Sequence, residues 1–279
     1  MIVRGFSQVD VFTSELGYGN PLAVIHDAEG LTEAEMLRIA SWTDLSETTF
    51  LTKPSYTRAD YGVRIFTPMG ELPFAGHPTL GSAHAWLEAG GRAANSELLV
   101  QECLIGLVRI RRDGHRLAFA APPLLRSGEV TADDVSEIVT FLGIERDAVV
   151  DAQWVDNGPG WVAVLLQDAD AVLGLRPRFG RSGELTEIGV VGPYSPGSEV
   201  AFEVRAFVLG ARNTEDPVTG SLNASLARWL IDSGRAPGSY VAAQGTAIGR
   251  RGRVHITKLG EDIWVGGDTI TGVTGLIHC

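Results

Sequence analysis

The chain contains little cysteine and no long apolar run. Only Cys103 and Cys279 are cysteines among its 279 residues, and no uninterrupted hydrophobic stretch has the ~18 residues that a membrane helix needs. The first residues do not form a charged segment followed by an apolar one, as a secretory leader does. We therefore expect a cytoplasmic protein with no membrane partner and no disulfide framework.

Basic residues are also few. The chain has 23 Lys and Arg against 34 Asp and Glu, a formal net charge of -11. Nucleic acids and anionic membranes are bound through basic patches, so we expect neither as a partner. A small anionic substrate is compatible with this charge, because backbone N–H groups can bind an anion locally.

Signatures of cofactor sites are missing as well. The six histidines are scattered, and none stands at metal-ligand spacing from a cysteine or a carboxylate. We find neither a phosphate-binding loop nor a nicotinamide fingerprint. The sequence therefore predicts no metal and no cofactor.

The composition is that of a globular protein, with 44% hydrophobic and 20% charged residues, long enough for one large domain or two ordinary ones. Short β-branched runs between Gly, Pro and Asp predict strands. A T-x-x-E capping box at Thr32 and Glu35 predicts one helix, and Thr131 with Gly143 bounds another. The predicted strands are Phe6–Phe12, Leu22–His26, Thr49–Lys53, Val63–Thr67, Leu98–Leu104, Leu107–Arg112, Arg116–Ala120, Val149–Val155, Trp161–Leu166, Val200–Val208, Gly252–Thr257 and Asp262–Val265.

The most informative feature is an internal repeat. Residues 61–66 have the sequence YGVRIF and residues 202–207 have FEVRAF, so both fit aromatic-x-V-R-x-F. Residues 77–82 (HPTLGS) and 216–221 (DPVTGS) both fit x-P-x-x-G-S. Val204 lies 141 residues after Val63, and Pro217 lies 139 residues after Pro78. Two motifs in the same order at nearly one spacing predict two homologous α/β halves, with a boundary near residues 122–123.

Each x-P-x-x-G-S turn leads into an apolar segment, Ser82–Ala89 or Ser221–Ser233, that predicts a buried helix. We expect the proline at the first helical position, where its missing N–H costs nothing. The following N–H groups have no intrahelical acceptor and, with the helix dipole, form a site for an anion. We expect the two helix N-termini to face one cleft and bind a substrate carboxylate.

The residue before each proline differs between the halves: His77 in the first and Asp216 in the second. An asymmetric acid/base site needs such a divergence. For Asp216 the alternative is a plain N-cap, and for His77 it is a structural or exposed histidine. From the residues alone these alternatives stay open, and Glu47 alone would pass for a solvated surface residue.

Several segments together resemble one known family. They are Gln8–Phe12, Gly19–Val24, Leu45–Phe50, Glu71–Thr79 and Glu215–Ser221, with Gln244-Gly245 and Gly249-Arg250 further on. In this order they are similar to the phenazine-biosynthesis PhzF-like isomerases over nearly the whole chain. The resemblance implies an α+β, diaminopimelate epimerase-like fold in which two pseudo-symmetric halves each wrap a curved mixed sheet around a central helix. It also implies a homodimer.

The resemblance assigns roles to particular residues. It implies that Glu47, His77 and Asp216 are catalytic, with Glu47 as the acid/base group, and that Gly76 and Ser221 bind the substrate. From the two turns we add Pro78, Thr79 and Gly220 as substrate-binding residues. Together with the internal repeat, the resemblance predicts an N-terminal half at residues 1–121 and a C-terminal half at residues 122–262. The last strand, at residues 263–279, is expected to return to the first half.

The resulting hypothesis is a cofactor-free isomerase that shuttles a proton within a small cyclic amino- or hydroxy-carboxylate, similar to dihydro-hydroxyanthranilate isomerase. A two-base racemase or epimerase is the nearest alternative, although both turns lack the cysteine that related enzymes use. A non-catalytic protein that binds a carboxylate metabolite is another, but it would gain nothing from Glu and Asp beside its ligand. A serine hydrolase is disfavoured because no nucleophile elbow surrounds Ser221.

Overall fold

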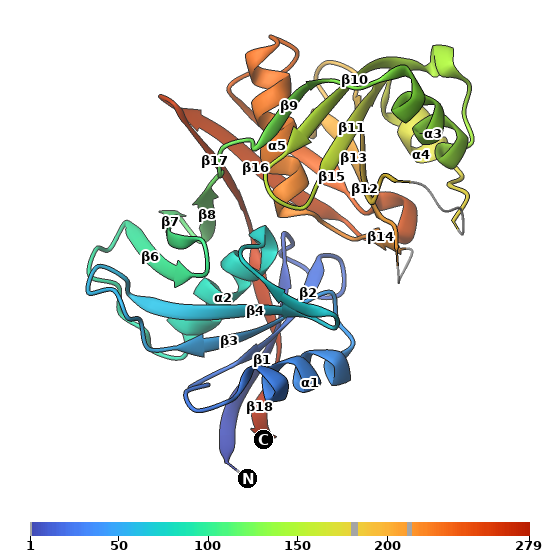
Figure 1. The fold of residues 1–279 in the computed structure, drawn as a ribbon. Coiled ribbons are helices and arrows are strands. Elements are labelled where there is room, and N and C mark those ends of the chain that lie inside the picture. Colours follow the sequence, from blue (N-terminus) through green and yellow to red (C-terminus); the bar gives the residue numbers. More distant parts are fainter. Residues whose placement is uncertain (1, 180–183, 211–213) are drawn as a thin grey trace. The chain divides into compact units, whose positions relative to one another are not determined.

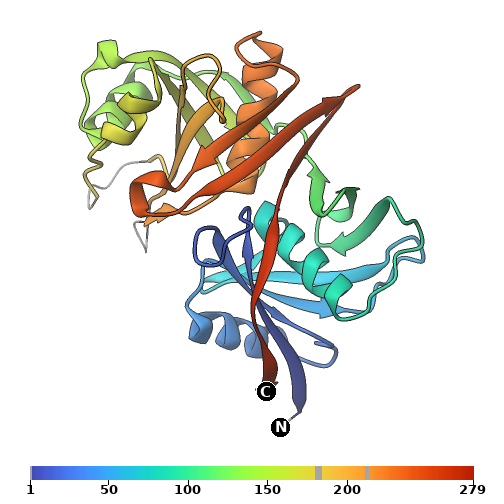
Figure 2. The same cartoon turned by 180° about the vertical axis from the view of Figure 1, so that it is seen from behind.

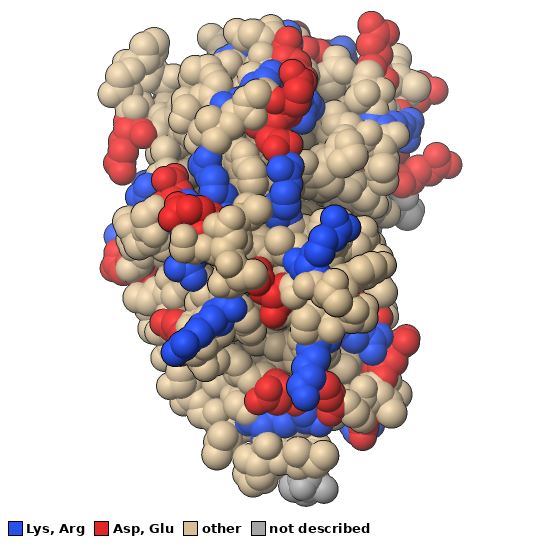
Figure 3. Space-filling view, turned by 90° about the vertical axis from the view of Figure 1, so that its left-hand side faces the viewer, with Lys and Arg blue, Asp and Glu red and all other residues tan. Residues whose placement is uncertain are grey.

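The computed structural model describes residues 2–179, 184–210 and 214–279. The chain divides into two compact units, each described by itself: unit 1 comprises Met1–Ala120 with Gly266–Cys279, and unit 2 comprises Ala121–Val265 (Figure 1). In the described residues no helix is both long and apolar enough to cross a membrane. Acidic and basic side chains are interspersed over the face of the molecule in Figure 3.

Unit 1 is a mixed sheet with two helices. Its strands pair in the order β18-β1-β2-β3-β4-β6-β7-β8, and the short β5 pairs with β4. The pairs β2–β3 and β4–β6 are parallel, and the others are antiparallel. Figure 2 shows β18 beside β1, with both chain ends close together. The elements are β1 (Val3–Val11), β2 (Asn20–Ile25), α1 (Glu33–Thr43), β3 (Thr48–Thr52), β4 (Tyr61–Thr67), β5 (Gly70–Leu72), α2 (Gly76–Glu88), β6 (Leu98–Cys103), β7 (Gly106–Asp113), β8 (Arg116–Ala120) and β18 (Thr269–His278).

Unit 2 repeats this pattern. Its strands pair in the order β9-β10-β11-β12-β13-β15-β16, with β14 on β13, and the parallel pairs are again β11–β12 and β13–β15. The predicted α+β fold of two similar halves is therefore confirmed. The elements are β9 (Arg126–Glu129), α3 (Ala132–Leu142), β10 (Val149–Asp156), β11 (Trp161–Leu166), α4 (Ala169–Gly174), β12 (Glu187–Pro193), β13 (Phe202–Val208), β14 (Thr214–Asp216), α5 (Gly220–Asp232), β15 (Ser239–Gln244), β16 (Gly252–Leu259) and β17 (Asp262–Gly267), the last of which runs into unit 1.

Side-chain alternation along β3 separates the two layers of unit 1. Phe50 is fully buried and packs in one cluster with Met36 of α1. Its neighbour Thr49 points the other way, because Ser82 of α2 donates a hydrogen bond to its hydroxyl at 2.9 Å. Thus α1 and α2 cover opposite faces of the sheet, and α2 is the buried central helix.

The same alternation holds along β12 in unit 2. Ile188 and Val190 pack in a cluster with Phe141 of α3. Gly189, between them, faces α5, since a Cβ built on it would lie 2.5 Å from the side chain of Leu222. The sequence analysis missed β12 because glycines usually weaken strands. Here the Leu222 side chain of α5 packs into the space beside this glycine.

The two predicted helix caps are confirmed, but both predicted helix starts with proline are wrong. Thr32 and Glu35 form the capping box of α1, and Gly143 ends α3 in the left-handed conformation. However, α2 begins at Gly76, so Pro78 is its third residue rather than its first. In unit 2, Pro217 precedes the N-cap of α5 by two residues. Proline fits α2 there because a first-turn residue needs no N–H donor.

Candidate active site

In unit 1 the structure brings Glu47 and His77 together. Glu47 immediately precedes β3, and its Oε2 lies 3.3 Å from Nε2 of His77, the second residue of α2. The side chains are 15% and 5% exposed, respectively. A carboxylate therefore lies at the start of the central helix, next to a buried imidazole.

Burial of the imidazole determines its charge. Loss of hydration lowers the pKa of His77 to about 3, so the ring is neutral at physiological pH. The Nδ2 amide of Asn20 lies 3.4 Å from Nδ1 of His77. An amide nitrogen can only donate, so Nδ1 accepts and the ring proton is placed on Nε2. The protonated Nε2 of the neutral ring therefore lies 3.3 Å from Glu47 Oε2, although the two atoms are not aligned as a hydrogen bond.

Asn20 was missed as a site residue by the sequence analysis. It is fully buried and begins β2. Its segment, Gly19–Val24, contributed to the family resemblance, but an Asn before a Pro is more typical of a turn. Nothing local in the sequence indicated that its amide would reach a histidine 57 positions away.

The remaining predicted residues of the first turn are buried in α2. Gly76, Pro78 and Thr79 are all buried. The Thr79 hydroxyl donates to the Ala75 carbonyl at 2.9 Å and accepts from the Gln101 amide at 3.1 Å. This threonine therefore stabilises the helix start, and its contact with a substrate stays a prediction.

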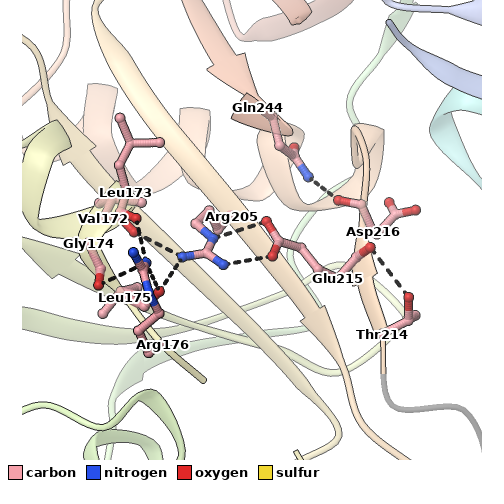
Figure 4. A network of polar contacts seen from close by, with 10 residues as sticks. All are labelled: Val172, Leu173, Gly174, Leu175, Arg176, Arg205, Thr214, Glu215, Asp216 and Gln244. Atoms are coloured by element: carbon pink, nitrogen blue, oxygen red, sulfur yellow. Dashed lines mark hydrogen bonds and ion pairs between the residues drawn. The ribbon is translucent and has the colours of Figure 1, made fainter. Parts of the chain in front are cut away.

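In unit 2, Asp216 ends β14 and does not cap α5. The N-cap is Thr219, which makes no side-chain capping bond and instead donates its hydroxyl to Asp216 Oδ2 at 2.5 Å. Gln244 Oε1 accepts the N–H of Thr219 at 3.0 Å. Gln244 Nε2 donates to the Asp216 carbonyl at 3.1 Å (Figure 4). These bonds hold the segment before α5 out of the helix and rule out the N-cap interpretation of Asp216.

A buried ion pair fixes the strand that carries Asp216. Arg205 of β13 donates to both carboxylate oxygens of Glu215, at 3.0 and 2.7 Å (Figure 4). The two side chains are only 6% and 8% exposed. Unit 1 has the matching pair, Arg64 with Glu71, at 2.7 and 2.5 Å. Each repeated V-R-x-F motif thus anchors the short strand ahead of its central helix.

Ser221 is the second residue of α5, and two side chains hold it. Trp161 Nε1 donates to its Oγ at 3.0 Å, and Asn157 Nδ2 donates to its carbonyl at 3.0 Å. An indole N–H is a donor only, so the Ser221 hydroxyl accepts it and keeps its own proton for another acceptor, such as a ligand carboxylate. Gly220, the first residue of α5, is buried beside it.

The described residues hold no group of three or more His, Cys, Asp or Glu side chains that could ligate a metal ion. Cys103 and Cys279 are both free thiols, and neither belongs to a repeated turn. The side-chain groups described at the helix starts are carboxylates, an imidazole and hydroxyls.

Comparison with known proteins agrees with this geometry. The family model described as phenazine biosynthesis-like protein matches residues 9–275. A protein of Schizosaccharomyces pombe named Antisense-enhancing sequence 1 is 36% identical over 99% of this chain and 99% of its own. The trans-2,3-dihydro-3-hydroxyanthranilate isomerase of Pseudomonas fluorescens is 34% identical over 87% of this chain and 86% of its own.

A solved structure extends the likeness to the whole fold. The phenazine biosynthesis protein of the PhzF family from Enterococcus faecalis superposes with a TM-score of 0.82 at 25% identity, over 100% of both chains. The resemblance found in the sequence motifs is confirmed. The chain belongs to the phenazine biosynthesis-like, or PhzF, family and is an isomerase of that family.

Proposed function

We propose that the chain is a cofactor-free isomerase that moves a proton between two carbons of a small cyclic amino- or hydroxy-carboxylate. The observation that carries this proposal is the 3.3 Å approach of the neutral His77 ring to Glu47 at the start of α2. A carboxylate held in a mostly dry site is suited to general acid/base catalysis. The Pseudomonas fluorescens relative, named for its action on trans-2,3-dihydro-3-hydroxyanthranilate, supports this substrate class.

In this proposal Glu47 removes a proton from a carbon that a neighbouring imine, enol or diene activates. The same group then returns the proton to another carbon, so that one carboxyl serves first as base and then as acid. His77, whose Nε2 lies 3.3 Å from Glu47 Oε2, is proposed to orient the carboxyl. No charge is added to the site, because the histidine is neutral.

The predicted site residues of unit 2 are proposed to bind polar groups of a substrate. The Ser221 hydroxyl and the first N–H groups of α5 would bind its carboxylate, because the N-terminus of a helix favours an anion. Asp216, held by Thr219, would bind its amine or hydroxyl group. Neutral donors for the carboxylate suit a protein with a net charge of -11.

The test is proton exchange in deuterated water. Protein is incubated with trans-2,3-dihydro-3-hydroxyanthranilate and, separately, with L-proline, and NMR follows deuterium at each carbon while chiral chromatography follows inversion. Isomerisation of the first compound supports the proposal, whereas inversion of proline without isomerisation favours the racemase. Calorimetric binding of either compound without exchange at any carbon contradicts both and favours the metabolite-binding protein.

A control separates this mechanism from thiol and metal chemistry. The Cys103→Ser, Cys279→Ser double variant and chelator-treated protein are both expected to keep the wild-type rate. Loss of turnover in the folded double variant would support a thiol racemase. Loss after chelation that one added metal restores would contradict the cofactor-free mechanism.

A further inference from the structure

The serine of the repeated x-P-x-x-G-S turn is bonded in opposite ways in the two units. In unit 1, Ser82 is fully buried and its hydroxyl donates to the Thr49 hydroxyl at 2.9 Å. In unit 2, Ser221 is half-buried and its hydroxyl accepts the indole N–H of Trp161 at 3.0 Å. Among the described residues, none accepts the hydroxyl proton of Ser221. The first serine therefore closes a contact inside its own unit, whereas the second keeps a proton that a ligand can accept.

Strand register shows why the first serine has an acceptor in its sheet and the second has none. The last residues of the two aromatic-x-V-R-x-F motifs pair with Thr48 of β3 and with Ile188 of β12, respectively. The next residues along these strands, Thr49 and Gly189, are therefore counterparts. Thr49 has a hydroxyl that accepts a hydrogen bond from α2, but Gly189 has no side chain to extend toward α5. The acceptor of unit 1 is thus replaced by a glycine in unit 2.

The strand beside β3 or β12 carries a second difference. At the register positions just compared, β3 pairs with Ala23 of β2, and β12 pairs with Val162 of β11. The residues just before these two, Leu22 and Trp161, are therefore counterparts. A Cβ built on Gly81 would lie 2.6 Å from the Leu22 side chain, so this leucine packs closely against α2 and offers no hydrogen bond. Trp161 instead donates its indole N–H to the serine of its unit.

Packing within unit 2 fixes the geometry of this donor. Trp161 is 2% exposed, and it faces α5 because its neighbour Val162 packs in the cluster around α3. Asn157, in the loop between β10 and β11, donates to the Ser221 carbonyl at 3.0 Å. Ser221 is the second residue of α5, where backbone N–H groups have no intrahelical acceptor. Its hydroxyl proton therefore lies next to backbone donors, and a ligand group that only accepts hydrogen bonds matches this set.

We propose that Trp161 is the positioning residue of the substrate-binding serine and makes the start of α5 selective for a carboxylate. This inference rests on the proposed function and deepens it. The indole N–H occupies a lone pair of the Ser221 hydroxyl, so the O–H turns away from Trp161 toward a ligand acceptor. A carboxylate only accepts hydrogen bonds and matches the hydroxyl and the backbone N–H groups. A neutral carboxamide matches them less well, because its NH2 group meets other donors.

The experiment compares Trp161→Phe with a matched control, Trp154→Phe. Both variants keep a buried aromatic ring and lose the indole N–H. Trp154, on the neighbouring strand β10, is 8% exposed, and its Nε1 has no hydrogen-bond partner among the described residues. It packs in the cluster around α3, on the other face of the sheet of unit 2 from α5. Only Trp161→Phe therefore removes the hydrogen bond to Ser221.

Calorimetry measures the dissociation constants of two aromatic probes, 3-hydroxyanthranilate and its carboxamide, which differ only in the charged group. Wild type is expected to bind the carboxylate at least about 30-fold more tightly, because charge-assisted hydrogen bonds are the stronger ones. This ratio is expected to be at least about fivefold smaller in Trp161→Phe and within about twofold of wild type in Trp154→Phe. With trans-2,3-dihydro-3-hydroxyanthranilate as substrate, Trp161→Phe is expected to raise KM about tenfold and to keep kcat within about threefold of wild type.

Ser221→Ala tests the same step without changing the indole, and it decides the question if Trp161→Phe does not fold. It is expected to reduce the ratio of the two dissociation constants by at least the same factor, and the double variant is expected to reduce it no further than Ser221→Ala does, because Trp161 acts through Ser221.

Three outcomes would overturn the role of Trp161. They are an unchanged ratio in folded Trp161→Phe or in Ser221→Ala, an equal fall of the ratio in Trp154→Phe, and a wild type that binds neither probe or binds both equally. A wild type that gives the expected ratios but moves no proton in trans-2,3-dihydro-3-hydroxyanthranilate would instead contradict the proposed isomerase and leave the role of Trp161 intact.

Discussion

The two units share one framework and differ where the chemistry is expected. Both hold an Arg–Glu pair ahead of the central helix, and in both a glutamine amide donates to a threonine near the helix start. Yet His77 lies inside the first turn of α2, whereas Asp216 ends a strand before α5. The repeated scaffold thus keeps its supports, while α5 begins five residues later than α2 relative to the repeated turn.

This shift changes what each helix start can do. In unit 1 the first turn is buried around a neutral imidazole that serves a carboxylate. In unit 2 the segment before the helix is held by Thr219 and Gln244, and the carboxylate of Asp216 is partly exposed. The proposed function uses this difference: it assigns proton transfer to Glu47 of unit 1, and substrate binding to Ser221 and Asp216 of unit 2.

The strongest test of this division is Glu47→Gln. The amide keeps the shape of the side chain but cannot take a proton, so kcat is expected to fall about 100- to 10,000-fold. Binding of the substrate is expected to change little, because the groups proposed to hold it belong to unit 2. Steady-state kinetics measures kcat, and calorimetry measures substrate binding. A kcat of Glu47→Gln within about tenfold of wild type would contradict the proposal that Glu47 is the acid/base group.

A second test compares the two ion pairs through Glu215→Gln and Glu71→Gln. Glu215→Gln leaves the buried Arg205 without its counter-charge, which is expected to cost about 3–5 kcal/mol of unfolding free energy. Glu71→Gln is expected to cost about 1 kcal/mol, because the Arg64 side chain is 30% exposed and water replaces part of the interaction. Urea denaturation measures both values. Equal losses of unfolding free energy in the two variants would show that the difference in burial between the two ion pairs does not affect their contribution to stability.

The smallest expected effect concerns the pH dependence that His77 contributes. Its folded-state pKa of about 3 lies below the ordinary 6.5, so the unfolded chain binds this proton more tightly. The favourable contribution of the neutral ring is complete above pH 6.5 and is lost as the pH falls toward 3, by at most about 1.4 kcal/mol per pH unit.

Unfolding free energies of wild type and His77→Gln at pH 7, 6 and 5 test this slope. The variant is expected to show a flatter dependence on pH than wild type. His84→Gln is the control in the same helix, because burial lowers the pKa of His84 but Glu88 opposes the shift. A wild-type slope that His77→Gln leaves unchanged would contradict a neutral, buried imidazole.

Much of the fold could be predicted from the sequence, because its signals are local or repeated. The capping box at Thr32 and the glycine after α3 act within a few residues, so each determines a helix end by itself. The recurrence of V-R-x-F and P-x-x-G-S predicted two similar halves, and the pairing of β4 with β6 and β13 with β15 repeats accordingly. The family was identified from a wider set of segments, which overlaps both P-x-x-G-S turns but not the V-R-x-F strands.

The missed elements and partners depend on contacts between distant residues. Only packing shows that Gly189 belongs to a strand, since Leu222 occupies the space of its missing side chain. Only the fold brings the amide of Asn20 to His77. The preference of proline for the first position of a helix, taken without tertiary contacts, placed Pro78 at the wrong position in α2. The sequence alone determined the repeated scaffold and its helix caps, because these follow from neighbouring residues. The tertiary structure decided which side chains meet, because desolvation and hydrogen bonding act through space between residues far apart in the chain.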